Sequence, residues 1–155
     1  MKPIPLILVV LLVLLGLGAL FGGAALMLAP DGSPFGMPRS MLDRTPFTSF
    51  LIPGLLLFLV NGVFPLVTAY GLARRPRWTA LDRLGVDGRH WADTTAALQG
   101  LALIVWTGYE FFCWGPVAVV LGYMALGVVL LALAAAPALL EDEPAAGRPG
   151  RARPA

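Results

Sequence analysis

The fold is decided by residues 6–29, which read LILVVLLVLLGLGALFGGAALMLA and contain no polar side chain. A helix rises about 1.5 Å per residue, so this run is long enough to cross the roughly 30 Å hydrocarbon core of a bilayer with some tilt. A cleaved signal peptide has the same basic start, here Lys2, but its apolar region is only about 7–15 residues long. We therefore expect residues 6–29 to remain in the protein as a membrane span.

Three further apolar runs follow, at residues 50–73, 95–112 and 117–140. The chain of 155 residues is 58% hydrophobic and 13% charged, against roughly 45–50% and about 25% in globular proteins. A water-soluble domain has no place for so much apolar surface. The sequence predicts an all-α membrane domain over residues 1–140, with four transmembrane helices in an antiparallel bundle, and a disordered tail over residues 141–155.

The cysteine and histidine content excludes several kinds of site. Cys113 is the single cysteine, so an internal disulfide, a CxxC redox pair and a cysteine-based zinc site are excluded. His90 is the single histidine, which excludes a multi-histidine metal centre. The basic residues flank apolar runs instead of forming a soluble basic face, which argues against nucleic-acid binding. We expect no metal, no cofactor and no nucleic-acid partner.

Lysine and arginine side chains fall mainly on one side of the predicted membrane. The N terminus, the second loop and the tail together carry nine of them, whereas the first loop carries two, Arg39 and Arg44. Cytoplasmic loops carry the excess of basic residues, so both termini are predicted to be cytoplasmic. The Pro/Gly-rich first loop, residues 30–49, is then an outer loop, and its residues 40–44 are expected to form one helical turn.

The second loop combines basic and aromatic side chains. Arg74, Arg75 and Arg77 suit anionic lipid headgroups, and Trp78 and Trp91 suit anchoring at the membrane interface. The same arginines also serve as the topology signal, and nothing in the sequence separates the two roles. The N-cap of the third span is expected at one of three residues, Asp93, Thr94 or Thr95.

Small residues recur along one face of the first span and one face of the fourth. Such faces allow helix backbones to approach closely in a bilayer. We expect them to pack inside the bundle, and a dimer interface is the alternative. The residues are Gly18, Gly22, Ala25 and Ala29 in the first span and Ala118, Gly122, Ala125, Ala132 and Ala136 in the fourth.

Polar residues form stripes on the two middle spans. In the second span Gly54, Asn61 and Thr68 recur every seven positions with Phe58 and Pro65 between them, and in the third the stripe contains Gln99, Leu103, Trp106 and Glu110. Facing the stripes toward each other hides the polar groups from lipid. The antiparallel arrangement then places Glu110 level with Gly54 and Phe58, below the outer loop.

Glu110 is the one acidic residue inside a predicted span, and an ionisable group there is a functional-site candidate. It has three interpretations: an interfacial or ion-paired structural group with Arg39 or Arg44 as its partner, a ligand-binding group, or a proton-transfer or catalytic group. We predict no catalytic residue. The predicted ligand-binding residues are Asn61, Trp106, Glu110, Gly54, Phe58, Arg39, Asp43 and Arg44.

The placement of glycine and proline in the first third of the chain forms a pattern that is similar to one in a known group of proteins. The pattern comprises Gly22-Gly23, Pro30-Asp31-Gly32, Gly36-Met37-Pro38, Thr45-Pro46-Phe47 and Phe50-Leu51-Ile52-Pro53-Gly54. It resembles a group of small four-span bacterial inner-membrane proteins. The resemblance implies the four-span architecture and a bacterial cytoplasmic membrane, and it implies no activity.

Three functions are compatible with this pattern. The first is a non-enzymatic membrane protein, either an accessory subunit of a larger complex or a binder of a lipid or apolar ligand in an outer-leaflet pocket. The second is a transporter or channel that forms a homo-oligomer and uses Glu110 as a coupling group. The third is a lipid-modifying enzyme with Glu110 and Asp43 as acid and base.

Overall fold

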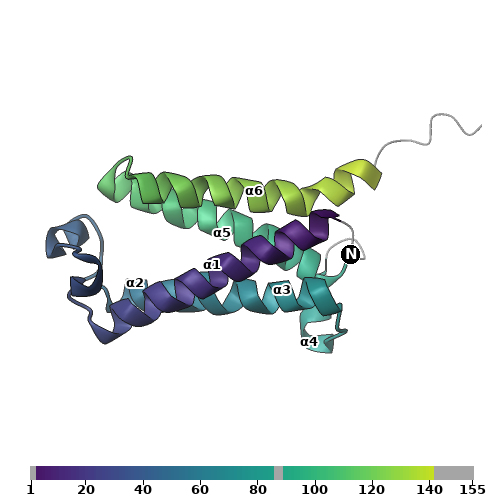
Figure 1. The fold of residues 1–155 in the computed structure, drawn as a ribbon, viewed down its shortest axis with the longest axis horizontal. Helices are drawn as coiled ribbons and strands as arrows, with labels where there is room; N and C mark the ends of the chain where they lie inside the picture. Colours follow the sequence, from purple (N-terminus) through teal and green to yellow (C-terminus); the bar gives the residue numbers. More distant parts are fainter. Residues whose placement is uncertain (1–2, 86–88, 142–155) are drawn as a thin grey trace, which may run out of the picture.

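The computed structural model describes residues 3–85 and 89–141, and this part of the chain is helical without any strand (Figure 1). Four of its helical segments are long and apolar enough to cross a membrane: Pro5–Leu28, Leu51–Arg74, Trp91–Trp114 and Ala118–Ala136. The prediction of an all-α protein with four membrane-length helices is confirmed. Residues 142–155, which make up almost all of the predicted tail, lie outside the described part, as does Lys2.

Consecutive spans run in opposite directions along the long axis of the molecule (Figure 1). The first span is α1 (Pro3–Leu28), the third is α5 (Trp91–Trp114) and the fourth is α6 (Ala118–Glu141). The second span is continuous but has three parts: α2 (Leu51–Leu56), η3 (Leu57–Val63) and α3 (Phe64–Arg74). The end of the bundle where α1 begins, α3 ends and α5 begins is called the closed end below. The end that carries residues 29–50 and the α5–α6 turn is called the open end.

The third span begins four residues earlier than its predicted start at residue 95. Its N-cap is His90, whose Nδ1 accepts a hydrogen bond from the amide of Ala92 at 3.2 Å. The predicted caps at Asp93, Thr94 or Thr95 are therefore wrong. The added turn carries Trp91, which is 1% exposed and packs against the other helices, and this burial extends the helix beyond its apolar run.

The middle of the second span is a π-helix, η3. Its hydrogen bonds skip one residue more than those of an α-helix, and the amide of Phe64 bonds to the carbonyl of Leu59. Pro65 follows directly, and a proline has no amide hydrogen and crowds the carbonyl four residues before it, here that of Asn61. The wider turn accommodates this proline within a continuous span. It also rotates the residues that precede it relative to those that follow.

The first hairpin, formed by α1 and the second span, packs through glycines. A Cβ at Gly23 would lie 2.7 Å from the carbonyl oxygen of Gly54, and a Cβ at Gly16 would lie 3.0 Å from that of Gly62. A side chain at these positions would force the backbones apart. The predicted packing face of α1 is therefore wrong at Gly18, where a Cβ would meet nothing within 4 Å, and at Gly22, where it would reach only Leu57 at 3.4 Å.

The second hairpin, formed by α5 and α6, also packs through a glycine pair. A Cβ at Gly100 would lie 2.8 Å from the carbonyl oxygen of Gly127. The predicted small-residue face of α6 instead points away from the described part of the bundle. Its members Ala118, Gly122, Ala125 and Ala132 are exposed.

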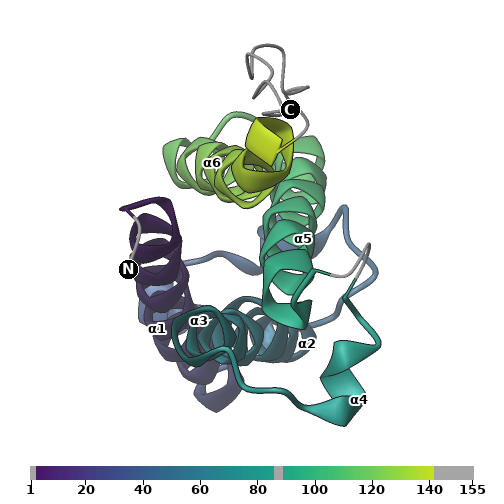
Figure 2. The same ribbon diagram turned by 90° about the vertical axis from the view of Figure 1, so that its right-hand side faces the viewer.

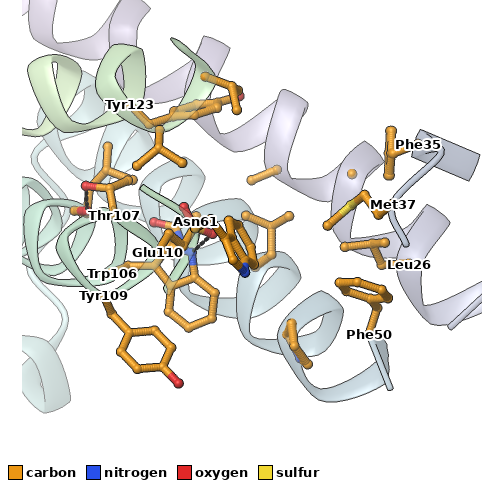
Figure 3. Close-up of a pocket in the computed structure, with 18 of the residues that line it drawn as sticks. Leu26, Phe35, Met37, Phe50, Asn61, Trp106, Thr107, Tyr109, Glu110 and Tyr123 are labelled. Carbon is orange, nitrogen blue, oxygen red and sulfur yellow. Dashed lines mark hydrogen bonds between the residues drawn. The ribbon is translucent and has the colours of Figure 1, made fainter. Parts of the chain in front are cut away.

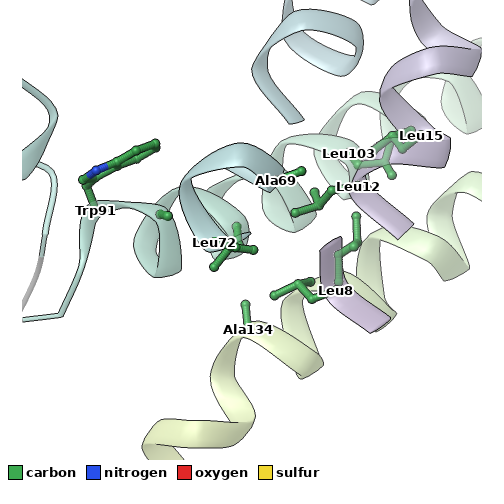
Figure 4. Packing of buried hydrophobic residues seen from close by; sticks show 11 residues of the cluster. Leu8, Leu12, Leu15, Ala69, Leu72, Trp91, Leu103 and Ala134 are labelled. Carbon is green, nitrogen blue, oxygen red and sulfur yellow. The ribbon is translucent and has the colours of Figure 1, made fainter. Parts of the chain in front are cut away.

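The two hairpins meet at the closed end, where one apolar cluster joins α1, α3, α5 and α6 (Figures 2 and 4). Small residues make this contact close: Ala69, Ala92 and Ala96 are each at most 3% exposed. The hydroxyl of Thr68 donates to that of Thr95 at 3.3 Å between α3 and α5. At the surface of this end, Arg75 forms an ion pair with Asp93 at 2.5 Å.

The connection between α3 and α5 continues the closed end. It contains the short helix α4 (Thr79–Asp82), which lies beside the bundle (Figure 2). The ring of Trp78 stacks between Tyr70 and Trp91, with centroid distances of 5.8 and 5.4 Å. The side chains of Arg74, Arg75 and Arg77 are exposed around this stack.

The connection between α1 and α2 covers the open end. It contains two short 3-10 helices, η1 (Ser33–Phe35) and η2 (Arg39–Leu42), and the latter overlaps the turn predicted at residues 40–44. Leu42 and Phe50 are buried against Leu26 at the end of α1. The indole of Trp114 on α5 donates to the carbonyl of Met41 at 2.7 Å. Residues 30–50 therefore bridge the two hairpins, and they are called the lid below.

Candidate functional site

A cavity of about 320 Å³ lies between the two hairpins at the open end (Figure 3). Helix α1, the second span, α5 and α6 form its walls, and the lid contributes the remaining side chains. Leu15 and Leu103 line it and also belong to the closed-end cluster, so the core of the protein forms the floor of the cavity. Its aromatic lining residues are Phe21, Phe35, Phe47, Phe50, Trp106, Tyr109, Trp114 and Tyr123. A volume above about 300 Å³, an apolar lining and a few polar groups are typical of sites for small molecules.

Two polar side chains meet at the inner part of the cavity. Asn61 lines the cavity from η3, and its Oδ1 accepts a hydrogen bond from Nε2 of Gln99 on α5 at 3.0 Å. Both side chains are at most 2% exposed, and Oε1 of Gln99 has no partner in the described part of the chain. The bond links the second span to α5 at the inner end of the cavity, where the two hairpins begin to diverge. It also fixes the orientation of the Asn61 amide toward α5.

Glu110 reaches the same cavity from α5. Its Oε1 accepts a hydrogen bond from the indole Nε1 of Trp106, one helical turn earlier, at 2.8 Å. Among the described residues that line the cavity none is basic, and no ion pair of Glu110 forms within the described part of the chain. Its carboxyl group therefore stands among apolar and aromatic side chains with one neutral hydrogen-bond donor. Figure 3 shows Tyr109 and Tyr123 on opposite sides of this group.

The structure brings together three of the predicted binding residues, Asn61, Trp106 and Glu110. Gly54 and Phe58 do not line the cavity, because both contact α1 at Gly23. The every-seventh-residue spacing that placed Gly54 beside Asn61 assumes a regular α-helix. The π-helix between them breaks that regularity and turns Gly54 toward α1.

The charged residues of the lid do not line the cavity either. Arg39, Asp43 and Arg44 are exposed, so neither the predicted ion pair with Glu110 nor an acid–base pair of Asp43 and Glu110 forms in the structure. Hydration keeps these charges at the surface, because burying them among apolar groups is costly. The lid meets the cavity with apolar side chains instead: Phe35, Met37, Leu42, Phe47 and Phe50.

Sequence reasoning placed the outer loop over the site but chose its charged residues, and it missed the apolar side chains of the lid and helix α6 as walls. The interleaving of Phe35, Met37 and Phe47 among turn-forming residues was the available signal, because a solvated loop rarely carries so many large apolar side chains. Tyr109 and Tyr123 carried no comparable signal. Their place in the wall depends on how α5 packs against α6, which follows from the glycine pair of this hairpin.

The cavity opens sideways between the hairpins. Phe21 on α1 and Val119 on α6 both line it, yet they are 72% and 59% exposed. Helices α1 and α6 converge at the closed end and separate toward the open end (Figure 1). The cavity therefore reaches the surface between α1 and α6, away from the lid.

Comparisons with protein-family models, with curated proteins and with solved structures found no match for this chain. The fold and its four apolar helices define a multi-pass helical membrane protein. Its distinguishing feature is the lidded cavity between two glycine-packed hairpins.

Proposed function

We propose that the protein is a non-enzymatic membrane protein that binds the apolar part of a lipid or of another membrane-dissolved amphiphile in the cavity at its open end. The cavity itself is the observation that supports this function most strongly. It has the volume of a small-molecule site, a mainly apolar lining, a lateral opening, and two polar side chains, Asn61 and Glu110, at fixed places inside it.

The proposed orientation places both termini in the cytoplasm of a bacterial cell and the open end in the outer leaflet of the inner membrane. The distribution of lysine and arginine supports this orientation. The closed end then faces the cytoplasm, where the exposed Arg74, Arg75 and Arg77 suit anionic lipid headgroups. Lateral association, as a homo-oligomer or within a larger complex, has a suitable surface in the exposed small-residue face of α6.

Apolar side chains of the lid favour binding over catalysis as the role of this site. The alternative of a lipid-modifying enzyme relied on Asp43 and Glu110 as its acid and base. Asp43 is exposed on the lid, and Glu110 is the one acidic residue among the described lining residues. A binding site needs only the shape and the few polar groups that are present.

A matched pair of glycine substitutions tests the proposal. Gly18 lines the cavity and Gly122 lies outside it on α6, and a Cβ at either position meets nothing within 4 Å. Gly18→Leu therefore fills the cavity without displacing a helix, whereas Gly122→Leu adds the same side chain to the lipid-facing surface. Dodecanol with a bromine at mid-chain serves as the probe, because a heavy atom beside Trp106 or Trp114 quenches tryptophan fluorescence.

Quenching is expected to saturate in the native protein and in Gly122→Leu, and to lose its saturable part in Gly18→Leu. The loss is at least about tenfold in affinity, because the added side chain occupies the volume that the tail needs. Non-saturable quenching in the native protein, or equal saturation in both variants, contradicts the proposed function.

A further inference from the structure

We propose that the cavity selects amphiphiles whose head is an ammonium group, and that Glu110 and the aromatic residues around it recognise that group. This inference rests on the proposed binding function and names the chemical class of the ligand. Three features of the cavity support this inference: a carboxyl group without a cationic partner in the described structure, many aromatic side chains in the lining, and apolar volume beside these side chains.

The first feature is the isolation of Glu110. A carboxylate among apolar groups is costly unless it is paired or well hydrogen-bonded, and Glu110 has one neutral donor, the indole of Trp106. The other carboxyl oxygen, Oε2, is not fully buried and has no hydrogen-bond partner in the described part of the chain. A ligand cation is the partner that this arrangement lacks.

The aromatic walls are the second feature. A cation is attracted to the face of an aromatic ring, and a group of aromatic side chains is a recurring way in which proteins recognise quaternary ammonium ligands. The indole of Trp106 donates to Glu110, Tyr109 and Tyr123 lie on opposite sides of this group, and Phe50 of the lid lies farther away (Figure 3). An anionic head finds no basic partner among the described lining residues.

The shape of the cavity sets the position of the ligand tail. Glu110 lies four residues before the end of α5, so it is about 6 Å from the open end along the helix. Toward the floor the walls include the aliphatic side chains of Leu15, Ala19 and Leu103, with Asn61 beside them. An ammonium group at Glu110 therefore leaves apolar volume for an alkyl chain, and the lateral opening accommodates the rest of a longer chain.

Three dodecyl probes, each with a bromine at mid-chain and differing only in the head, test this inference: a trimethylammonium, an alcohol and a carboxylate. Fluorescence quenching is measured in an uncharged detergent for the native protein, Glu110→Gln and Asp43→Asn. The glutamine keeps the size of the side chain and an oxygen for the Trp106 bond. Asp43→Asn removes one negative charge from the exposed lid and serves as the charge-matched control.

The native protein and Asp43→Asn are expected to bind the trimethylammonium probe at least about tenfold more tightly than the alcohol, and the carboxylate most weakly. In Glu110→Gln the trimethylammonium and alcohol probes become nearly equal, and the alcohol binds as in the native protein. Equal affinities in the native protein, or a preference for ammonium that survives in Glu110→Gln, overturn the inference while the binding function stands. Absence of saturable binding by all three probes overturns both.

Competition with natural lipids identifies the source of the ammonium group. Displacement of the ammonium probe by phosphatidylethanolamine, but not by phosphatidylglycerol, assigns the site to a membrane lipid. Absence of displacement by either lipid, with the preference for the ammonium probe intact, assigns it to a free organic cation. Displacement by phosphatidylglycerol as readily as by phosphatidylethanolamine contradicts recognition of the ammonium group.

Discussion

The closed and open ends of the bundle are built from the same four helices but differ in how the two hairpins meet. At the closed end one apolar cluster includes residues of α1, α3, α5 and α6. At the open end the corresponding cluster contains Leu26, Leu42 and Phe50, which belong to α1 and the lid, and no residue of α5 or α6 joins it among the described residues. The hairpins are packed together at one end and separated by a cavity at the other.

Side-chain size explains the difference. Gly71, Ala69, Ala92 and Ala96 lie where α3 meets α5 at the closed end, so the backbones approach closely. At the open end the facing positions carry aromatic rings, among them Trp106 and Tyr109, and the rings keep the helices apart. Close packing at one end thus supplies the stability that allows the other end to remain open.

The largest expected effect comes from disturbing the closed end. A Cβ at Gly71 would overlap the indole of Trp91 and lie 2.8 Å from the Cβ of Ala92, and both neighbours are buried. Gly71→Ala should therefore lower the free energy of unfolding by about 1–3 kcal/mol. Thermal unfolding in detergent, followed by loss of helical circular dichroism, measures the change.

Gly108→Ala is the matched control for this substitution. Gly108 lies on α5 toward the open end, and a Cβ there meets nothing within 4 Å. The change should be neutral or stabilising by at most about 1 kcal/mol, because alanine favours a helix over glycine. Equal destabilisation by the two substitutions would show that the two ends do not differ in packing.

Part of this contrast was predictable from the sequence. Apolar runs of membrane length specify four helices because a bilayer imposes a minimum span, and that constraint acts on each segment alone. Asn61, Trp106 and Glu110 were predicted for the site because hydrophilic side chains within a span are directed away from lipid.

The predictions that failed concern residue positions that are set by contacts with another segment or by the hydrogen bonding of the helix itself. The π-helix before Pro65 turned Gly54 out of the predicted stripe, and hydrogen-bond register within a helix is not visible in hydropathy. The choice of Gly23 over Gly22 as the packing residue depends on the shape of the opposing helix at Gly54. The position of the lid depends on bonds to α5, such as that from Trp114, between residues more than 70 positions apart.

A smaller effect is expected from loosening the lid. Trp114→Phe keeps the aromatic ring but removes the hydrogen bond to the carbonyl of Met41. One such bond contributes about 1 kcal/mol, so the lid should open about fivefold more often while the closed end is unaffected. Amide hydrogen exchange should accelerate within residues 30–50 and stay unchanged within residues 91–96. Faster exchange in both segments would mean that the two ends unfold together.

The smallest effect concerns the first turn of the lid. The Ser33 hydroxyl donates to Oδ1 of Asp31 at 2.7 Å and the Ser33 amide donates to the same oxygen at 3.0 Å, and these bonds lower the pKa of Asp31 below its ordinary value of 3.8. Because the folded-state pKa is depressed, the bonds support the turn above pH 3.8 and are lost as the pH falls through the lower value. Ser33→Ala should move the midpoint of the Asp31 carboxyl titration, followed by nuclear magnetic resonance, back toward 3.8 without reaching it, since the amide still donates. Ser40→Ala, in the same lid but outside this turn, should leave the midpoint unchanged, and a shift of equal size there would show that the whole lid, and not this turn, sets the pKa.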